Sequence, residues 1–368
     1  MASNNQKNLI EILTQHQAYL YRASSQSVNE LTKLFNSESD AMLSKLRDLL
    51  DELNDAEKVA LAGAQYTTNN LKEIRDLISQ WFASLSTSIP EVFAVSAAAL
   101  AVYEANYTAR LYGGKIKKQN GHKLYSSAKK TPLVGGALVD DLLSKIAESA
   151  QQKVEYAIRD GISSGKTNHE IIQRIRGTKR QNYEDGFLST STADIERTVR
   201  TVRSHVANQA YQDSFNQLGF EYVKLVATLD GRTSKLCASL DGTVWAINDP
   251  AKRVPPLHPN CRSILVPVDK DGLLVGQRPF VMDERRVKDI PKDEREQLIG
   301  QIDANTTFKA FFKKTDDFFQ KEWLGPKRFK LYKEGKFDFD KFFDPDGQLY
   351  TLEHLRKLDE LKFKELGI

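Results

Sequence analysis

The sequence predicts an α+β fold that is predominantly α-helical. Apolar residues recur at intervals of three and four over most of the first 218 positions, which is helical spacing. Residues 220–268 are instead rich in β-branched and turn-forming types, which predicts a few short antiparallel strands. Helical spacing with dense aromatic residues follows. The 368 residues are enough for two or three domains and a sizeable core.

The N-terminal region, residues 1–112, is expected to be an array of several antiparallel helices. Its apolar residues keep helical spacing from Leu9 onward, and no proline occurs before Pro90. Ser25, Ser27 and the polar run 36–40 are the expected caps and breaks. Packing between neighbouring helices explains the apolar stripes more simply than an exposed docking face does.

Residues 113–136 are expected to form a basic linker between glycine pairs. The chain has no acidic residue between Glu104 and Asp140. The positive residues here are a candidate nucleic-acid site, since lysine and arginine neutralise phosphates: Arg110, Lys115, Lys117, Lys118, Lys123, Lys129 and Lys130. The interleaved aromatic residues are candidates for stacking on bases: Tyr107, Tyr112, His122 and Tyr125. A solvated flexible linker is the alternative.

Helical spacing resumes over residues 137–175 and again in a helix expected to start at Ser191 or Thr192 and end at Gly219. Three strands are expected after it, at residues 220–228, 244–247 and 262–268.

The two cysteines of the chain, Cys237 and Cys261, lie between the first and third of these strands, with His258 three residues before the second. Zinc accepts such ligands, but a structural site normally needs a fourth. The candidates for that fourth ligand are His205, Asp230, Asp241 and Asp249. A disulfide is a second interpretation. Two reduced, buried thiols beside a histidine are the preferred one, so no cofactor is expected.

Composition and motifs exclude several classes of protein. Lys and Arg number 53 against 49 Asp and Glu, so the net charge is +4 and any basic surface is local. Two cysteines rule out a secreted disulfide framework. The N-terminus lacks a signal-peptide pattern, and the most apolar windows fall short of the 18 residues of a membrane span. Nucleotide-binding, zincin and α/β-hydrolase motifs are absent, and a nucleophilic Cys237 with His258 as base lacks a recognisable third group, so no enzymatic activity is expected.

An ordered series of residues runs through this β-containing region. It consists of Arg200, Thr201, Asn208, Thr228, Leu229, Asp230, Arg232, Thr233, Cys237, Leu240, Asp241, Gly242, Pro255, Pro256, His258, Pro259, Cys261 and Arg262. The series resembles the phage head morphogenesis family, the minor head proteins typified by the F protein of bacteriophage Mu. Ser263 stands where that family often has another cysteine. Residues 306–355, with Gln320, Leu324, Gly325 and Arg328, resemble the C-terminal extension of many members.

Together with the patterns above, which predict helical residues 1–112 and the linker 113–136, the resemblance implies a Mu F-like domain at 137–278 and a helical extension at 279–368. The N-terminal helical region matches no known family. It also implies a late minor capsid protein that acts in procapsid assembly and DNA packaging, in the head interior or at the portal vertex of the virion, and in the host cytoplasm during assembly. The implied partners are the portal protein, scaffolding or major capsid protein and DNA, with no membrane. The alternatives are a DNA-binding internal or ejected virion protein, and a metal-dependent or toxin-like enzyme that uses Asp230, Arg232, Cys237 and His258.

The residues also have a structural interpretation of their own. Gly231 and Gly242 permit tight turns, and Pro255, Pro256 and Pro259 stiffen the long loop, so the series is expected to pin the connections between strands. The C-terminal aromatic residues are expected to form a small core: Phe308, Phe311, Phe312, Phe318, Phe319, Trp323, Phe337, Phe339, Phe342 and Phe343. The last residues, 352–366, are expected to form one amphipathic helix with charged pairs.

Overall fold

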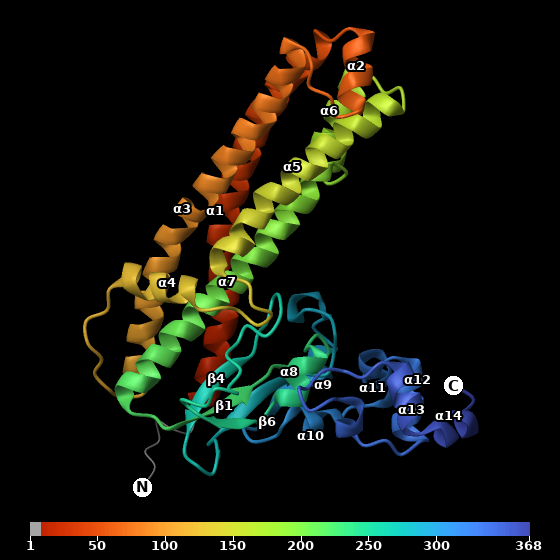
Figure 1. Cartoon of the computed structure of the whole chain (residues 1–368). Coiled ribbons are helices and arrows are strands. Elements are labelled where there is room, and N and C mark those ends of the chain that lie inside the picture. Colours follow the sequence, from red (N-terminus) through yellow and green to blue (C-terminus); the bar gives the residue numbers. More distant parts are fainter. Residues whose placement is uncertain (1–8) are drawn as a thin grey trace. The chain divides into compact units, whose positions relative to one another are not determined.

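The computed structural model describes residues 9–368, with side chains at a few positions before Arg22 and at all positions from there on (Figure 1). Within this part of the chain helices predominate and short strands form two small sheets, which confirms the predicted α+β class. The chain divides into two compact units. Unit 1 contains residues 9–20, Asn106–Lys117 and Tyr211–Ile368, and unit 2 contains Tyr21–Ala105 and Lys118–Ala210. Residues 1–8, part of the predicted 1–112 segment and the place of the signal-peptide prediction, lie outside the described chain.

Unit 2 is a helical bundle. Its helices are α1 (Leu9–Asp51), α2 (Asp55–Ala62), α3 (Asn69–Leu111), α4 (Gly121–Lys130), α5 (Val139–Ser163), α6 (Asn168–Arg176) and α7 (Phe187–Leu218), of which α1, α3 and α7 continue into unit 1. Phe35 of α1 packs against Trp81 of α3, and Ser27 bonds Ser96 further along, so these two helices run antiparallel. The predicted division consists of four segments that are each continuous in sequence, whereas each unit combines separate stretches of the chain. The predicted division therefore stays a prediction.

The expected breaks at Ser25, Ser27 and residues 36–40 are wrong, because α1 is continuous through all of them. The serines do not cap a helix end here: Ser27 is buried and accepts a hydrogen bond from Arg203 of α7 at 3.0 Å. The chain turns instead at Asn54, whose side chain accepts from the Glu57 amide in a capping box.

The helix expected from Ser191 or Thr192 begins earlier, at Phe187. Ser191 is fully buried in that helix, where its hydroxyl accepts from Lys153 of α5 at 3.5 Å, so it is an internal contact rather than a cap. The predicted end is right. Gly219 follows the last helical residue with a φ of +78°, a conformation that glycine adopts at little cost.

Helix α3 contains an 18-residue window with a mean hydropathy of 1.6, long and apolar enough to cross a membrane by length and composition. The expectation that every apolar window falls short is therefore wrong. Alanines 97, 98 and 101 contribute to this hydropathy and are buried in the bundle, although only 39% of the window is buried. A core helix passes the same test, so the absence of a membrane partner stays a prediction.

The predicted linker, residues 113–136, contains helix α4. Asn120 caps this helix by accepting from the Lys123 amide, and its inner face buries Tyr125 and Ala128. The ring centroids of Tyr125 and Phe93 are 6.2 Å apart, and the Ala128 carbonyl accepts a hydrogen bond from Nε2 of His205 at 3.0 Å. The segment is thus tied to the bundle, because its apolar residues have the spacing of a short amphipathic helix.

Unit 1 has two three-stranded sheets. The first, in the order β3-β1-β4, is antiparallel and pairs β1 (Tyr222–Val226) with β3 (Val244–Ala246) and β4 (Ile264–Val268), at the three predicted places. The second pairs β5 (Gln277–Val281) with β2 (Leu229–Asp230) and β6 (Ile299–Asp303). The β2–β5 pair is parallel, which departs from the antiparallel expectation.

The C-terminal part of unit 1 surrounds an aromatic core. Its helices are α8 (Lys235–Leu240), α9 (Arg295–Leu298), α10 (Phe308–Phe312), α11 (Asp317–Leu324), α12 (Pro326–Lys333), α13 (Leu352–Leu358) and α14 (Glu360–Leu366). The predicted core is confirmed, and Phe312 contacts Trp323 and Phe339 within it. Phe318 is the exception, being 74% exposed. The expected final helix is two helices, since Asp359 ends α13 and caps α14.

Candidate functional site

Unit 1 gathers most of the residues of the ordered series around α8 and the turn before β4. Cys237 lies in α8, whose N-cap Ser234 accepts from the Cys237 amide. His258 and Cys261 come from the proline-rich loop before β4, where the Pro255–Pro256 peptide is cis. This loop packs against α8, so Cys237 contacts His258 and Cys261, which are more than twenty positions away in the sequence.

The three side chains form a compact cysteine–histidine cluster. The Cys237 sulfur is 3.2 Å from Nε2 of His258 and 3.7 Å from the Cys261 sulfur, and the three ligand-type atoms lie within 4.8 Å of one another. Both cysteines are buried, whereas His258 is partly exposed. Nδ1 of His258 donates to the Pro259 carbonyl at 2.8 Å. The sulfurs are much further apart than the roughly 2.05 Å of a disulfide, so both thiols are free.

The cluster perturbs the protonation of its own members. The hydrogen bond donated by the Cys237 thiol holds the pKa of Cys261 well below its usual range, against burial, and His258 adds to this. That same hydrogen bond, followed by burial, raises the pKa of Cys237. Burial lowers the pKa of His258, but its interactions with Cys261 and Pro259 outweigh burial and raise it overall. A thiolate at Cys261 is therefore the favoured anionic form.

None of the four predicted fourth ligands joins this cluster within the described chain. His205 belongs to unit 2 and bonds the Ala128 carbonyl there. Asp249 accepts from the Ala251 amide. Asp230 and Asp241 each take part in an ion pair, described next.

Asp230, at the end of β2, is the centre of a buried network. Its carboxylate accepts two hydrogen bonds from the Arg262 guanidinium, at 2.5 and 2.7 Å, and further bonds from Arg232 and from the Thr233 hydroxyl. Burial alone raises the pKa of Asp230, but the Arg262 hydrogen bonds and charge, with those of Arg232 and Thr233, outweigh it and lower the pKa. The carboxylate is thus held ionised as a structural anchor between β2 and the turn before β4.

Asp241 forms a second buried ion pair, with Arg278 of β5, at 3.1 Å. Its oxygens also accept from the amides of Ala227 and Phe308, at 2.7 and 2.6 Å. Arg278 further donates to the carbonyls of Thr306 and Ala227. The sequence reasoning missed Arg278, because an arginine in a short strand carries no local signal of burial.

The turn residues act as predicted. Gly242 has a φ of +90°, and a Cβ there would lie 2.8 Å from the Thr307 methyl carbon. A Cβ on Gly231 would lie 3.0 Å from the backbone of Glu284. Both positions therefore favour glycine. Pro256 is buried in the loop, and Pro259 accepts the His258 hydrogen bond.

Arg200 and Thr201 are the members of the site prediction that belong to unit 2. Arg200 pairs with Glu196 at 2.7 Å and donates to Ser24 of α1 at 2.6 Å, and the Thr201 hydroxyl donates to the Arg197 carbonyl. The Arg200–Ser24 bond joins α7 to α1, whereas the Glu196 and Arg197 contacts lie within α7.

The predicted basic site is divided between the units. Arg110, Lys115 and Lys117 belong to unit 1, and Lys118, Lys123, Lys129 and Lys130 belong to unit 2. All are exposed except Lys129, which is half-buried and pairs with Asp140 at 2.8 Å.

The expected stacking faces are wrong for two of the aromatic residues. Tyr125 is buried against Phe93. Tyr112 lies edge-on to Phe215 and Phe220. Burial raises the pKa of both phenols, as expected of rings in a core. Tyr107 stacks on His16 at 3.8 Å, and His122 is exposed. The rings of Tyr125 and Tyr112 thus pack against phenylalanine side chains inside the protein, and they are not exposed for stacking on nucleic-acid bases.

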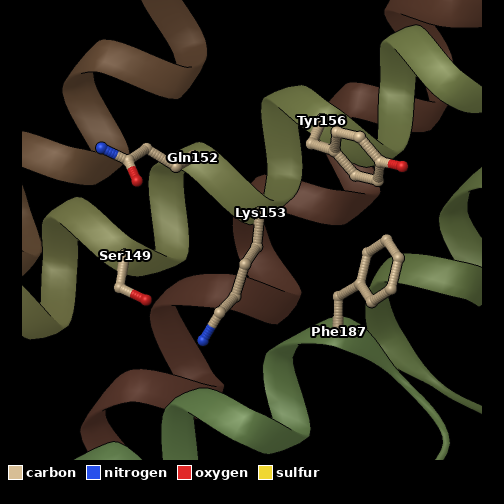
Figure 2. Close-up of a pocket in the computed structure, with 5 residues that line it drawn as sticks. All are labelled: Ser149, Gln152, Lys153, Tyr156 and Phe187. Atoms are coloured by element: carbon tan, nitrogen blue, oxygen red, sulfur yellow. The ribbon is translucent and has the colours of Figure 1, made fainter.

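A separate cavity of about 280 Å³ lies between α5 and α7 (Figure 2). Its lining is Ser149, Gln152, Lys153, Tyr156 and Phe187. Lys153 is paired with Asp194 at 3.3 Å, which neutralises the cation of the cavity. The cysteine–histidine cluster, whose members contact one another directly, is the stronger candidate.

Residues 152–266 match the model of a family described as phage Mu protein F like protein. The match begins in α5 and ends in β4, so it contains the complete series from Arg200 to Arg262 and the cysteine–histidine cluster. It stops before the aromatic C-terminal region, whose resemblance stays a prediction. No curated protein and no solved structure matches the chain.

Proposed function

We propose that this chain, whose residues 152–266 match the phage Mu protein F like family, is a minor head protein bound at the portal vertex inside the procapsid. The family match is the observation that carries the proposal. A phage head morphogenesis protein is a component of the virion, and a minor one is built in beside scaffolding and major capsid protein before DNA packaging.

The surface of unit 2 supports a docking role. Val92, Val95 and Tyr103 are exposed on one side of α3, and Val95 is 71% exposed. Their spacing of three and eleven residues places them within about 80° of one another around the helix. An apolar stripe of this kind is suited to packing against a helix or groove of another protein. We assign it to the portal protein.

Co-purification with the portal protein tests this assignment. The full chain is expressed with the portal protein of the same phage, beside the variants Val95→Asp and Val59→Asp. Val59 is a matched control, since it is 72% exposed in the same unit but lies in α2. We expect Val95→Asp to lose the portal protein and Val59→Asp to retain it, both at the wild-type melting temperature. Recovery with major capsid protein alone, or equal binding by both variants, would reject the portal assignment.

Contact with DNA is a second proposal, supported by the exposed lysines of the basic segment. We expect binding of duplex DNA to weaken steeply with salt, with a slope of about 0.9 per phosphate contact. Glutamine at Lys115, Lys117, Lys118, Lys123 and Lys130 should flatten that slope. Lys129→Gln is the control, because this lysine is already paired with Asp140. An unchanged slope in the fivefold variant would remove DNA as a partner of this segment.

We also propose that the chain is not an enzyme. A cysteine nucleophile must be reachable and readily ionised, but Cys237 is 2% exposed and its pKa is raised. Asp230 of the toxin-like alternative accepts hydrogen bonds from both Arg232 and Arg262. These groups are engaged in holding the fold.

A further inference from the structure

We propose that Cys237, His258 and Cys261 bind one zinc ion, which ties α8 to the turn before β4. The site does not depend on the portal assignment: it is a property of the folded chain, tested on the purified protein. It assigns a ligand to the one described group of His, Cys and acidic side chains that is compact enough to hold a metal.

The spacing of the ligand atoms fits a tetrahedral zinc site. Zinc–sulfur bonds of about 2.3 Å and a zinc–nitrogen bond of about 2.0 Å at tetrahedral angles require edges of about 3.8 Å between sulfurs and about 3.5 Å between sulfur and nitrogen. The observed separations are 3.7 Å between the sulfurs and 3.2 Å from the Cys237 sulfur to Nε2 of His258. These two separations lie within a few tenths of an ångström of the required edges, and the third pair, the Cys261 sulfur and Nε2 of His258, lies within 4.8 Å.

The histidine is already oriented for coordination. Its Nδ1 donates to the Pro259 carbonyl, so the other nitrogen, Nε2, points toward the sulfurs. A metal-bound histidine almost always has such a partner on its second nitrogen, because the partner fixes the tautomer and the ring plane. A histidine that only filled space in the loop would have no need of this arrangement.

Donor chemistry selects zinc among the common metals. Two thiolates and an imidazole are soft and borderline ligands, unsuited to calcium or magnesium, which take oxygen. Iron–sulfur clusters need about four cysteine ligands, and this chain has only two cysteines. The fourth zinc position falls to an oxygen donor, either water beside the partly exposed His258 or the buried Ser263 hydroxyl, which contacts Cys237.

The bound ion would act as a cross-link. Cys237 is separated by 21 residues from His258 and by 24 from Cys261, so the metal closes the long loop that carries β3. A metal bound only by the folded state stabilises that state. We therefore expect zinc to raise the melting temperature of the full chain, and a chelator to lower it.

Cobalt(II) substitution provides the decisive measurement. The full-length, reduced protein is stripped with a chelator and titrated with Co²⁺, then with Zn²⁺. We expect a sulfur-to-cobalt charge-transfer band that saturates at one equivalent and is abolished by Zn²⁺. Cys237→Ser and Cys261→Ser should each lose the band, while the control His354→Ala should keep it, because His354 lies in α13 and stacks on Tyr350.

If the cysteine variants do not fold, the reactivity of the two thiols in the wild-type protein tests zinc binding without them. Added zinc should slow the reaction of both thiols with a disulfide reagent at least tenfold, and a chelator should restore it. A folded, reduced wild-type protein with no cobalt band and unchanged thiol reactivity in zinc would overturn the proposal.

Discussion

Removal of the Asp241 carboxylate is expected to destabilise unit 1 strongly. Its side chain has no exposed surface and that of Arg278 is 4% exposed, so Asp241→Ala leaves a buried guanidinium without its counter-ion. Loss of one partner of a buried pair costs about 3–5 kcal/mol. The amides of Ala227 and Phe308 also lose their acceptor, at about 1–3 kcal/mol each where water cannot enter.

These terms overlap, because one relaxation can serve several groups, and we expect a total of about 4–6 kcal/mol. The whole stability of a domain is about 5–15 kcal/mol, so the loss is a large part of it. Asp241→Asn keeps an acceptor but not the charge, and should cost about 1.5–3 kcal/mol. Glu353→Gln, which breaks an exposed pair with Lys357, is the control and should leave stability unchanged.

Urea unfolding measured by tryptophan fluorescence reports the effect, since Trp323 lies in the core of unit 1. The double variant Asp241→Ala/Arg278→Met removes both charges and should recover part of the loss. A cost below about 1 kcal/mol for Asp241→Ala, or a double variant that is worse than the sum of its parts, would refute the account of a buried, mutually dependent pair.

Two further predictions concern the same unit. The pKa of Asp230 is lowered in the fold, so its ionisation stabilises the fold above the unfolded pKa of 3.8, and this contribution is lost as the pH falls through the lower folded pKa. The melting-temperature advantage of wild type over Asp230→Asn should therefore be largest near neutral pH and shrink below about pH 4, and an advantage that grows with acid would contradict it. Phe339→Ala should cost about 3–5 kcal/mol in urea unfolding, because Phe339 is 1% exposed, whereas Phe318→Ala should change little, because that ring is 74% exposed. Equal costs for the two variants would mean that the aromatic core does not stabilise the unit.

Local signals were reliable where the chain itself decides the structure. Gly219 ends α7 because its positive φ suits glycine, and the three strands of the first sheet form where β-branched residues lie between turns. The dense phenylalanines have too much apolar surface to remain in water, so they predict a core. In each case the cause lies within a few residues of the effect.

Local signals failed where a distant partner decides. Ser27 favours a helix cap in isolation, but Arg203 and Ser96 satisfy its hydroxyl inside the bundle, so α1 continues through it. Tyr125 interleaves with lysines along the chain, yet α4 turns it against Phe93. The Asp241–Arg278 pair joins residues 37 positions apart. The sequence around either residue therefore does not predict which residue it pairs with.

The ordered series shows how internal contacts alone can make a set of residues recognisable in sequence. Asp230 is bonded to Arg262, and Cys237 contacts His258 and Cys261, so the middle and the end of the series contact each other. Contacts of this kind fix both the residue types and the distances between them, because a change at one end removes the partner of the other. The series therefore describes how the loop is closed upon α8. Binding to other head proteins requires surface that these internal contacts leave free, and exposed positions outside the series, such as Val95 on α3, meet that requirement.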